Sequence, residues 1–163
     1  MPFAVICGKS AVLHRHRMPD GKDKHMTILV IDGQGGKLGR SLVENIRREF
    51  PEVDLVAVGT NSMATAAMMK GGAVRAATGE NPVVVACRSA DIIVGPLGIA
   101  IADSLMGEVT PAMAVAVGQA DAIRVLIPMN RCENLVAGVS STSTTALIQD
   151  AVSKIAQHIA QNQ

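Results

Sequence analysis

Three regularly spaced glycines mark the stretch of this sequence whose residue types and spacing best suit a ligand-binding site. Gly33, Gly36 and Gly39 follow the apolar run 28–31 and Asp32, and they precede a helical pattern. Glycine lets the backbone turn sharply and leaves no side chain between it and a ligand. A helix that begins after such a turn presents unpaired N–H groups, which favour an anion such as phosphate. The stretch therefore predicts a site for a nucleotide or another phosphorylated small molecule.

The glycine spacing distinguishes between types of phosphate-binding loop. The pattern GxGxxG does not fit, because Gly39 comes one residue late. The pattern GxxGxxG fits, and it resembles the nucleotide loop of extended short-chain dehydrogenases and some small reductases. The P-loop pattern GxxxxGK[ST] nearly fits, but Gly33 lies one residue too far back and Arg40 replaces the lysine. A tight turn that only packs the helix against the sheet is the structural alternative.

The second predicted strand gives little support for a dinucleotide. In dinucleotide-binding folds an acidic residue at the end of that strand holds the ribose hydroxyls. Here the strand ends in Gly59, Thr60 and Asn61, and Asp54 lies at its other end. NAD is therefore disfavoured. NADP or another nucleotide stays open, although no arginine stands there to receive a 2′-phosphate.

Alternating strands and helices must position the loop. The sequence predicts strands at 27–31, 55–58, 73–77, 91–94 and 124–127, and helices at 37–50, 62–70, 82–89, 111–119 and 144–160. A short helix at 99–105 and a last strand at 135–139 are further expectations. Asn81 and Pro82 predict the start of the third helix, with a strand at 83–85 as the alternative. These elements imply a three-layer Rossmann-like sandwich with a mostly parallel, doubly wound sheet of five or six strands.

Ligands in such a sheet bind beyond the carboxyl ends of the strands. The predicted ligand-binding residues lie in the loops there: Asp32, Gly33, Gln34, Gly35, Gly36, Lys37, Leu38, Gly39, Thr60, Asn61, Thr78, Gly79, Asn81, Gly95, Pro96, Asn130 and Arg131. Among the basic residues, Lys37, Arg40 and Arg131 are candidates for contact with phosphate, although Arg40 is equally a solvated helix residue. No metal site is predicted.

Glu80 is the predicted acid–base group if the protein is an enzyme, because it lies in a glycine-containing loop at a strand end. The alternative is a glutamate that is stabilised by the dipole of the following helix. Cys132, beside Arg131, is a candidate nucleophile. Since no histidine is predicted nearby, a buried thiol is its alternative.

The composition fits a globular protein and excludes several classes. The chain has 163 residues, 48% of them hydrophobic, and its only aromatic residues are Phe3 and Phe50. Stacking of nucleic acid bases on aromatic side chains is therefore excluded, and a net charge of +1 gives no basic field for nucleic acid. No apolar run reaches about 18 residues, so no membrane partner is expected. Cytoplasm is the expected location, and the helices, rich in Met and Ala, predict a homo-oligomer.

Residues 1–25 differ from the rest of the chain. Their apolar patches precede a basic stretch, which is the reverse of a signal peptide. We interpret 1–25 as an extension outside the core and 26–163 as a single Rossmann-like domain, with Met26 as an alternative start of the chain. His14 and His16 have the spacing of a metal-binding pair on a strand, and an exposed basic tail is the alternative.

Several motifs in one order carry a resemblance to a known family: IDGQGGKLG, VGTNSMAT, GAVRAATGEN, ADIIVGPLGI, GEVTPAMA and IPMNRC. Together they resemble a family of small bacterial proteins catalogued as a domain of unknown function, over about residues 26–139. The resemblance implies a stand-alone Rossmann-like unit and adds no substrate. It also places residues 1–25 outside the family unit.

Three functions follow as hypotheses. The leading one is a Rossmann-like protein that binds a nucleotide or phosphorylated small molecule at residues 33–39. The second is a non-catalytic ligand-sensing or regulatory subunit, which passes its signal through oligomer contacts. The third is a degenerate P-loop phosphohydrolase. The sequence leaves open whether the protein is an enzyme.

Overall fold

The computed structural model describes residues 26–129, 134–139 and 143–162. Within them, one sheet is formed by β1 (Thr27–Asp32), β2 (Asp54–Gly59), β3 (Arg75–Thr78), β4 (Ile92–Pro96) and β5 (Ile123–Ile127). All neighbouring strands are parallel, in the order β3-β2-β1-β4-β5. From β1 the chain adds β2 and β3 on one side of the sheet, and then it returns to add β4 and β5 on the other side of β1. The sheet is therefore doubly wound, as predicted.

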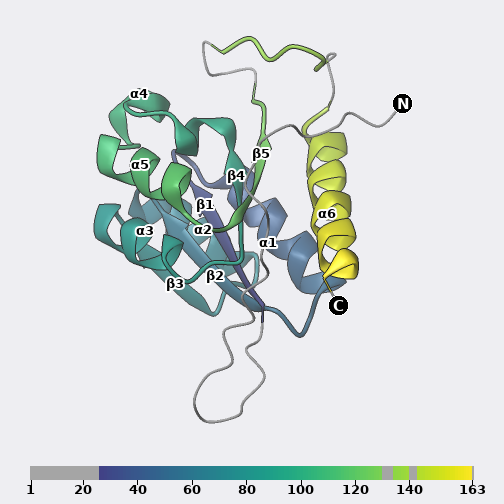
Figure 1. The fold of residues 1–163 in the computed structure, drawn as a ribbon. Helices are drawn as coiled ribbons and strands as arrows, with labels where there is room; N and C mark the ends of the chain where they lie inside the picture. The colour runs from purple at the N-terminus through teal and green to yellow at the C-terminus, as the bar shows by residue number, and fades with distance from the viewer. Residues whose placement is uncertain (1–25, 130–133, 140–142, 163) are drawn as a thin grey trace.

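Helices cover both faces of this sheet (Figure 1). One face carries α1 (Lys37–Glu49), α2 (Ser62–Lys70) and α6 (Thr144–Gln161), and α6 lies beside α1. The other face carries α3 (Glu80–Cys87), the 3-10 helix η1 (Leu97–Ala100), the short segment α4 (Ser104–Gly107) and α5 (Pro111–Gln119). The result is the predicted three-layer Rossmann-like sandwich, built by the crossovers that parallel strands require.

The central strand β1 belongs to both halves of the hydrophobic core. Ile28 and Val30 pack with α1 and α6, whereas Leu29 and Ile31 pack with α3 and α5. All four side chains are buried, because both faces of the strand are covered. The loop after β1 is therefore held at the centre of the sheet edge, with rigid elements on each side.

The start of α3 differs from its prediction. The helix begins at Glu80, not at Pro82, and the residue before it is Gly79 and not Asn81. Gly79 has φ 103°, which favours a residue without a Cβ and explains why glycine takes the capping position. The segment is a helix, so the alternative of a strand at 83–85 is wrong.

Two further predicted elements are wrong. The helix expected over 99–105 is replaced by η1 and a turn, in which Asp103, Leu105 and Met106 have positive φ values of 62°, 55° and 61°. Residues 135–139 form no strand: they are exposed, and Leu135 is fully so, because no strand of the described sheet lies alongside them. The strand expected at 73–77 is observed as β3, which begins two residues later than expected.

Some predictions fall outside the described residues. They concern Asn130, Arg131 and Cys132, and also residues 1–25 with His14 and His16. The division of the chain into an extension and a domain therefore stays a prediction. In the described part of the chain, no helix is long and apolar enough to cross a membrane.

Candidate functional site

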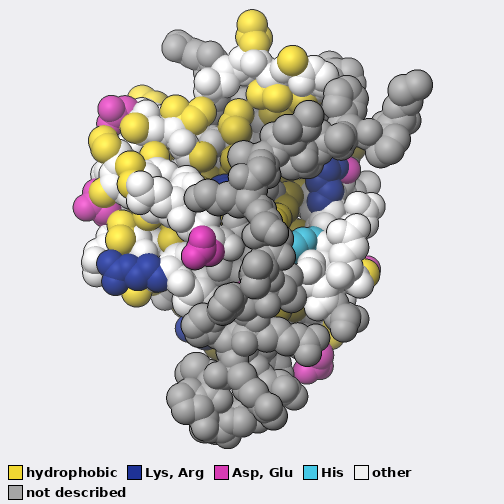
Figure 2. Space-filling view, in the orientation of Figure 1, with side chains coloured by type: hydrophobic (Ala, Val, Ile, Leu, Met, Phe, Trp, Pro, Cys, Tyr) yellow, Lys and Arg dark blue, Asp and Glu magenta, His cyan; other side chains and the backbone are white. Residues whose placement is uncertain are grey.

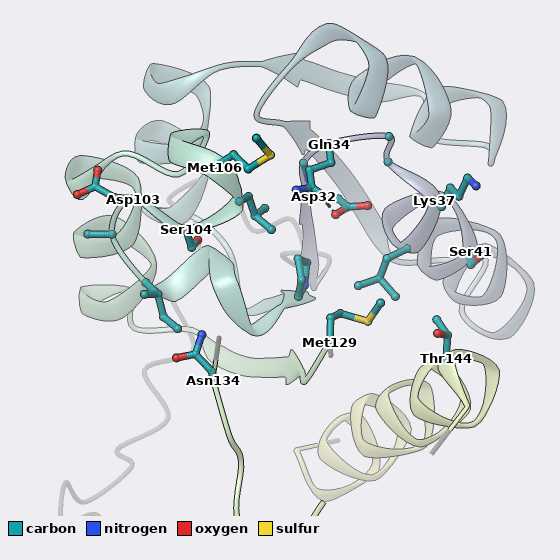
Figure 3. A pocket seen from close by; sticks show the side chains of 18 residues that line it. Asp32, Gln34, Lys37, Ser41, Asp103, Ser104, Met106, Met129, Asn134 and Thr144 are labelled. Atoms are coloured by element: carbon teal, nitrogen blue, oxygen red, sulfur yellow. Dashed lines mark hydrogen bonds between the residues drawn. The ribbon is translucent and has the colours of Figure 1, made fainter. Parts of the chain in front are cut away.

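A cavity of about 880 Å³ opens at the carboxyl edge of the sheet (Figure 3). Segments after β1, β4 and β5 and the first residue of α6 line it: Asp32, Gly33, Gln34, Gly35, Gly36, Lys37, Leu38, Ser41, Pro96, Ile101, Ala102, Asp103, Ser104, Leu105, Met106, Met129, Asn134 and Thr144. The order of the strands reverses between β1 and β4: β2 and β3 lie on one side of β1, and β4 and β5 lie on the other. Ligands in open α/β sheets bind at such a point. The volume of the cavity falls in the range of small-molecule sites, about 300–1,000 Å³.

Three backbone N–H groups beside the cavity have no hydrogen-bond partner in the described chain, those of Gly35, Lys37 and Leu38. The neighbouring groups are satisfied: the Gly36 N–H donates to the Gly33 carbonyl at 3.0 Å, and the Gly39 N–H donates to a side chain. Unpaired N–H groups in the first turn carry the positive end of the helix dipole. This side of the loop is therefore suited to an anion.

Asp32 fills the inside of the glycine turn. Its Oδ1 accepts the Gly33 N–H at 2.8 Å, and its Oδ2 accepts the Gly39 N–H at 2.6 Å. The side chain is buried, with 5% exposed. Burial raises the pKa of Asp32; the bonds from Gly39 and Gly33 lower it, and the charge of Glu108 raises it, so that the pKa lies above its ordinary value. Asp32 thus braces the loop from within.

The glycines of the loop fall into two groups. At Gly33, Gly36 and Gly39 an added Cβ would come within 2.7 Å of other atoms, and at Gly36 these atoms belong to α2. Close packing therefore favours glycine at all three positions, most firmly at Gly36, where the atoms met include the backbone of Ala64 and where φ is 66°. At Gly35 an added Cβ would meet nothing within 4 Å. The glycine that faces open space is the one that the GxxGxxG pattern omits.

Glu108 is the principal residue that the sequence did not reveal. Its Oε2 accepts hydrogen bonds from the Gln34 N–H at 2.8 Å, from Thr60 Oγ1 at 2.5 Å and from Asn61 Nδ2 at 2.9 Å. Partial burial raises the pKa of Glu108, but these three bonds together outweigh it and hold the pKa below its ordinary value. Since 48 residues separate Glu108 from Thr60, no local pattern could have indicated the contact.

The structure brings only part of the predicted site together. Asp32–Leu38 and Pro96 line the cavity, whereas Gly39 does not and packs against Asp32. Thr60 and Asn61 lie on the opposite side of the loop, bound to Glu108. Cavity residues that were not predicted include Ser41, Asp103, Ser104, Asn134 and Thr144.

Other predicted residues have partners within the protein and do not line the cavity. Thr78 Oγ1 lies 2.6 Å from the hydroxyl oxygen of Thr65. Glu80 Oε2 accepts a hydrogen bond from Thr110 Oγ1 at 2.5 Å, and Arg40 pairs with Glu44 on α1.

Two glycines and one asparagine, Gly79, Gly95 and Asn81, are further predicted site residues that do not line the cavity. An added Cβ at Gly95 would lie 2.2 Å from the carbonyl oxygen of Ile31, so close approach of β1 and β4 accounts for that glycine. Gly79 and Asn81 lie at the start of α3, away from the cavity lining. The ligand or catalytic roles of all these residues, Glu80 included, stay predictions.

Both fold and sequence place the protein in a class. The parallel, doubly wound sheet with a crevice at its reversal point defines a Rossmann-like α/β protein. Within that class, the chain belongs to the family described as a domain of unknown function, DUF3842, whose model matches residues 27–160. The match confirms the predicted resemblance and extends it into α6.

Two solved structures that match this chain share little sequence with it. A dodecameric FMN-dependent UbiX-like decarboxylase from Escherichia coli O157:H7 is 19% identical, with 80% of this chain and 76% of that chain covered and a TM-score of 0.42. A nucleoside-diphosphate-sugar epimerase from Pseudomonas aeruginosa is 18% identical, with 85% of this chain and 49% of that chain covered and a TM-score of 0.43. No curated protein matches the sequence.

Proposed function

We propose that the protein binds a nucleotide or another phosphorylated small molecule in the cavity beside residues 33–39. The observation that carries this proposal is the set of unpartnered N–H groups of Gly35, Lys37 and Leu38, which border the cavity. A phosphate at this place accepts hydrogen bonds from the first turn of α1 and lies near the Lys37 side chain. The exposed Lys37 has no ion pair with any described residue, so its charge is available.

The remaining walls suit the organic part of such a ligand. Ile101, Leu105, Met106 and Met129 supply aliphatic surface, and Figure 3 shows Met106 and Met129 on opposite sides of the opening. Ligand pockets commonly combine apolar walls with a few polar groups that fix orientation. The proposal is for binding, because Glu80, the predicted acid–base group, does not line this cavity. The binding role is compatible with the ligand-sensing hypothesis and requires no reaction.

The position of Asp32 argues against the phosphohydrolase hypothesis. A P-loop surrounds phosphate with its own N–H groups. Here the N–H groups of Gly33 and Gly39 point at the Asp32 carboxylate, which fills the inside of the turn and repels a second anion. A phosphate is therefore expected outside the turn, at the start of α1.

Direct binding measurements test the proposal. We expect a monophosphate such as AMP, FMN or ribose 5-phosphate to raise the unfolding free energy, by about 2.7 kcal/mol at 100 times its Kd. Lys37→Ala should weaken that binding about tenfold, since a charge-assisted hydrogen bond contributes about 1.5–3 kcal/mol. Lys70→Ala, at the far end of α2, is the matched control and should bind as the unchanged protein does.

Two results would contradict the proposal. One is that no phosphorylated compound stabilises the protein, with ATP plus magnesium and NADP included in the panel. The other is that the Lys37 and Lys70 variants lose affinity equally, which would show a general charge effect and no contact at the loop.

The homo-oligomer and the cytoplasmic location stay predictions. Apolar side chains gather over the end of the molecule that carries α4 and α5 (Figure 2). Among them, Met106 is 95% exposed and Val115 is 53% exposed. Exposed apolar surface of this kind is compatible with a contact between copies of the chain.

A further inference from the structure

We infer that Glu108 determines the size of the ligand: it closes the β2 side of the glycine loop, so that the site accepts a single nucleotide unit and rejects dinucleotides. The inference rests on the proposed function, because it concerns the same loop. A dinucleotide in a doubly wound sheet spans the crevice, with one half over the loop toward the end of β2. The β2 end is therefore the place that decides between one and two nucleotide units.

The polar groups at the β2 end are already used within the protein. Thr60 Oγ1 donates to Glu108 Oε2 at 2.5 Å. Asn61 Nδ2 donates to the same oxygen at 2.9 Å and to the Gln34 carbonyl at 3.0 Å, while Asn61 Oδ1 accepts the Ala64 N–H at 2.9 Å. A ribose at this place finds these donors occupied and must break bonds to a carboxylate to reach them.

The same place is also filled. The position of an added Cβ at Gly33 lies 2.8 Å from Glu108 Oε2 and 2.9 Å from Leu105 Cδ1. The segment 105–108 therefore lies directly against the loop. It reaches that place through a turn in which Asp103, Leu105 and Met106 have positive φ, a conformation that is unfavourable for residues other than glycine. Contacts such as the hydrogen bond from the Asp103 N–H to the Val109 carbonyl, 2.8 Å long, hold the turn.

Charge acts in the same direction as shape. The Glu108 carboxylate is stabilised by three donors and faces the side of the loop where the second phosphate and ribose of a dinucleotide would approach. Like charges placed side by side oppose binding. The open cavity lies on the other side: none of its described lining residues follows β2 or β3. A ligand of one nucleotide unit fits there without disturbing Glu108.

Calorimetric titration with NAD⁺ and FAD, and with their halves AMP, NMN and FMN, tests this inference. The unchanged protein should bind at least one monophosphate tenfold or more tightly than the dinucleotide that contains it. Glu108→Ala should reduce that preference at least tenfold, because it removes the carboxylate charge and frees the Thr60 and Asn61 donors that are bound to Glu108 Oε2. Glu52→Gln, an exposed glutamate in the turn before β2 at the opposite edge of the sheet, is the matched control and should keep the preference.

Thr60→Val provides a second variant in case Glu108→Ala does not fold. It removes one of the three donors and keeps the carboxylate, so the preference should fall in the same direction by a smaller factor. Circular dichroism and a denaturant titration establish that each variant is folded.

The outcomes separate this inference from the proposed function. If NAD⁺ or FAD binds the unchanged protein as tightly as its halves, the inference is wrong and the proposed function stands. If Glu108→Gln weakens dinucleotide binding, Glu108 holds a ribose and the inference is again wrong. If none of the five compounds and no other phosphate compound binds, the proposed function fails and the inference fails with it.

Discussion

The two sides of the glycine loop differ in what satisfies their N–H groups. On the side of β4 and β5, Gly35, Lys37 and Leu38 line a cavity, and their N–H groups have no hydrogen-bond partner in the described chain. On the side of β2, the Gln34 N–H donates to Glu108, a carboxylate from a distant part of the chain. The protein thus supplies its own anion to one side and leaves the N–H groups of the other side without a partner among the described residues.

This difference shows what a glycine pattern can and cannot report. Gly33, Gly36 and Gly39 lie where other protein atoms approach the backbone closely, whereas at Gly35 an added Cβ would meet no atom within 4 Å. A phosphate site and a tight packing site select the same residue for the same reason, which is the absence of a Cβ. Substitutions on the two sides of the loop should therefore have different effects.

The largest expected effect is on stability, at Gly36. Gly36→Ala should lower the unfolding free energy by about 3 kcal/mol, because its Cβ meets α2 at 2.6 Å and its φ of 66° disfavours alanine. Gly35→Ala should change it by less than about 0.5 kcal/mol, since no atom lies within 4 Å of the new methyl group. Urea denaturation of both variants measures the difference. Equal losses at the two positions would show that the two groups of glycines do not differ.

An intermediate effect is expected at the residue that ties the closed side together. Asn61 caps α2 through Ala64 and also donates to Glu108 and to the Gln34 carbonyl. Asn61→Ala should cost about 2 kcal/mol, since the cap contributes about 1 kcal/mol and the lost bonds add to it. Ser143, whose hydroxyl caps α6 and has no other partner among the described residues, is the matched control, and Ser143→Ala should cost about 1 kcal/mol. If the two variants lose the same amount, the bonds across the loop contribute nothing measurable.

The smallest expected effect concerns pH. The pKa of Glu108 is lower in the folded than in the unfolded chain, so its stabilisation is complete above the ordinary value of 4.5 and is lost as the pH falls through the folded value. The raised pKa of Asp32 acts in the opposite direction; its largest cause, burial, is the same in both proteins compared, and only the smaller contribution from the Glu108 charge differs. Glu108→Gln should therefore lose less stability between pH 6 and pH 3 than the unchanged protein, by under about 1 kcal/mol. If the unfolding free energies of the two proteins change in parallel with pH, the Glu108 carboxylate does not stabilise the folded state as described.

Much of the fold could be predicted from periodicity. The buried strand β1 is a continuous apolar run, and α2 and α5 begin after Asn61 and Thr110, whose side chains cap them. Such signals are local, because hydrogen bonding within a helix and burial of a strand depend on neighbouring residues. The predictions that were wrong, at 99–105 and 135–139, fall where long-range contacts or their absence decide the backbone. The turn at Leu105 and Met106 is held by hydrogen bonds within 103–109 and by the contacts of Leu105 and Glu108 with the glycine loop.

By itself, the sequence determined the Rossmann-like class, the order of the elements and the place of the loop after β1. Only the tertiary structure decided which atoms meet that loop. It placed Asp32 inside the turn, α2 against Gly36 and Glu108 against the β2 end, and it left Gly35, Lys37 and Leu38 facing a cavity. The reason is physical: a hydrogen bond or a steric contact depends on distance in space, and the residues that close one side of this loop lie far from it along the chain.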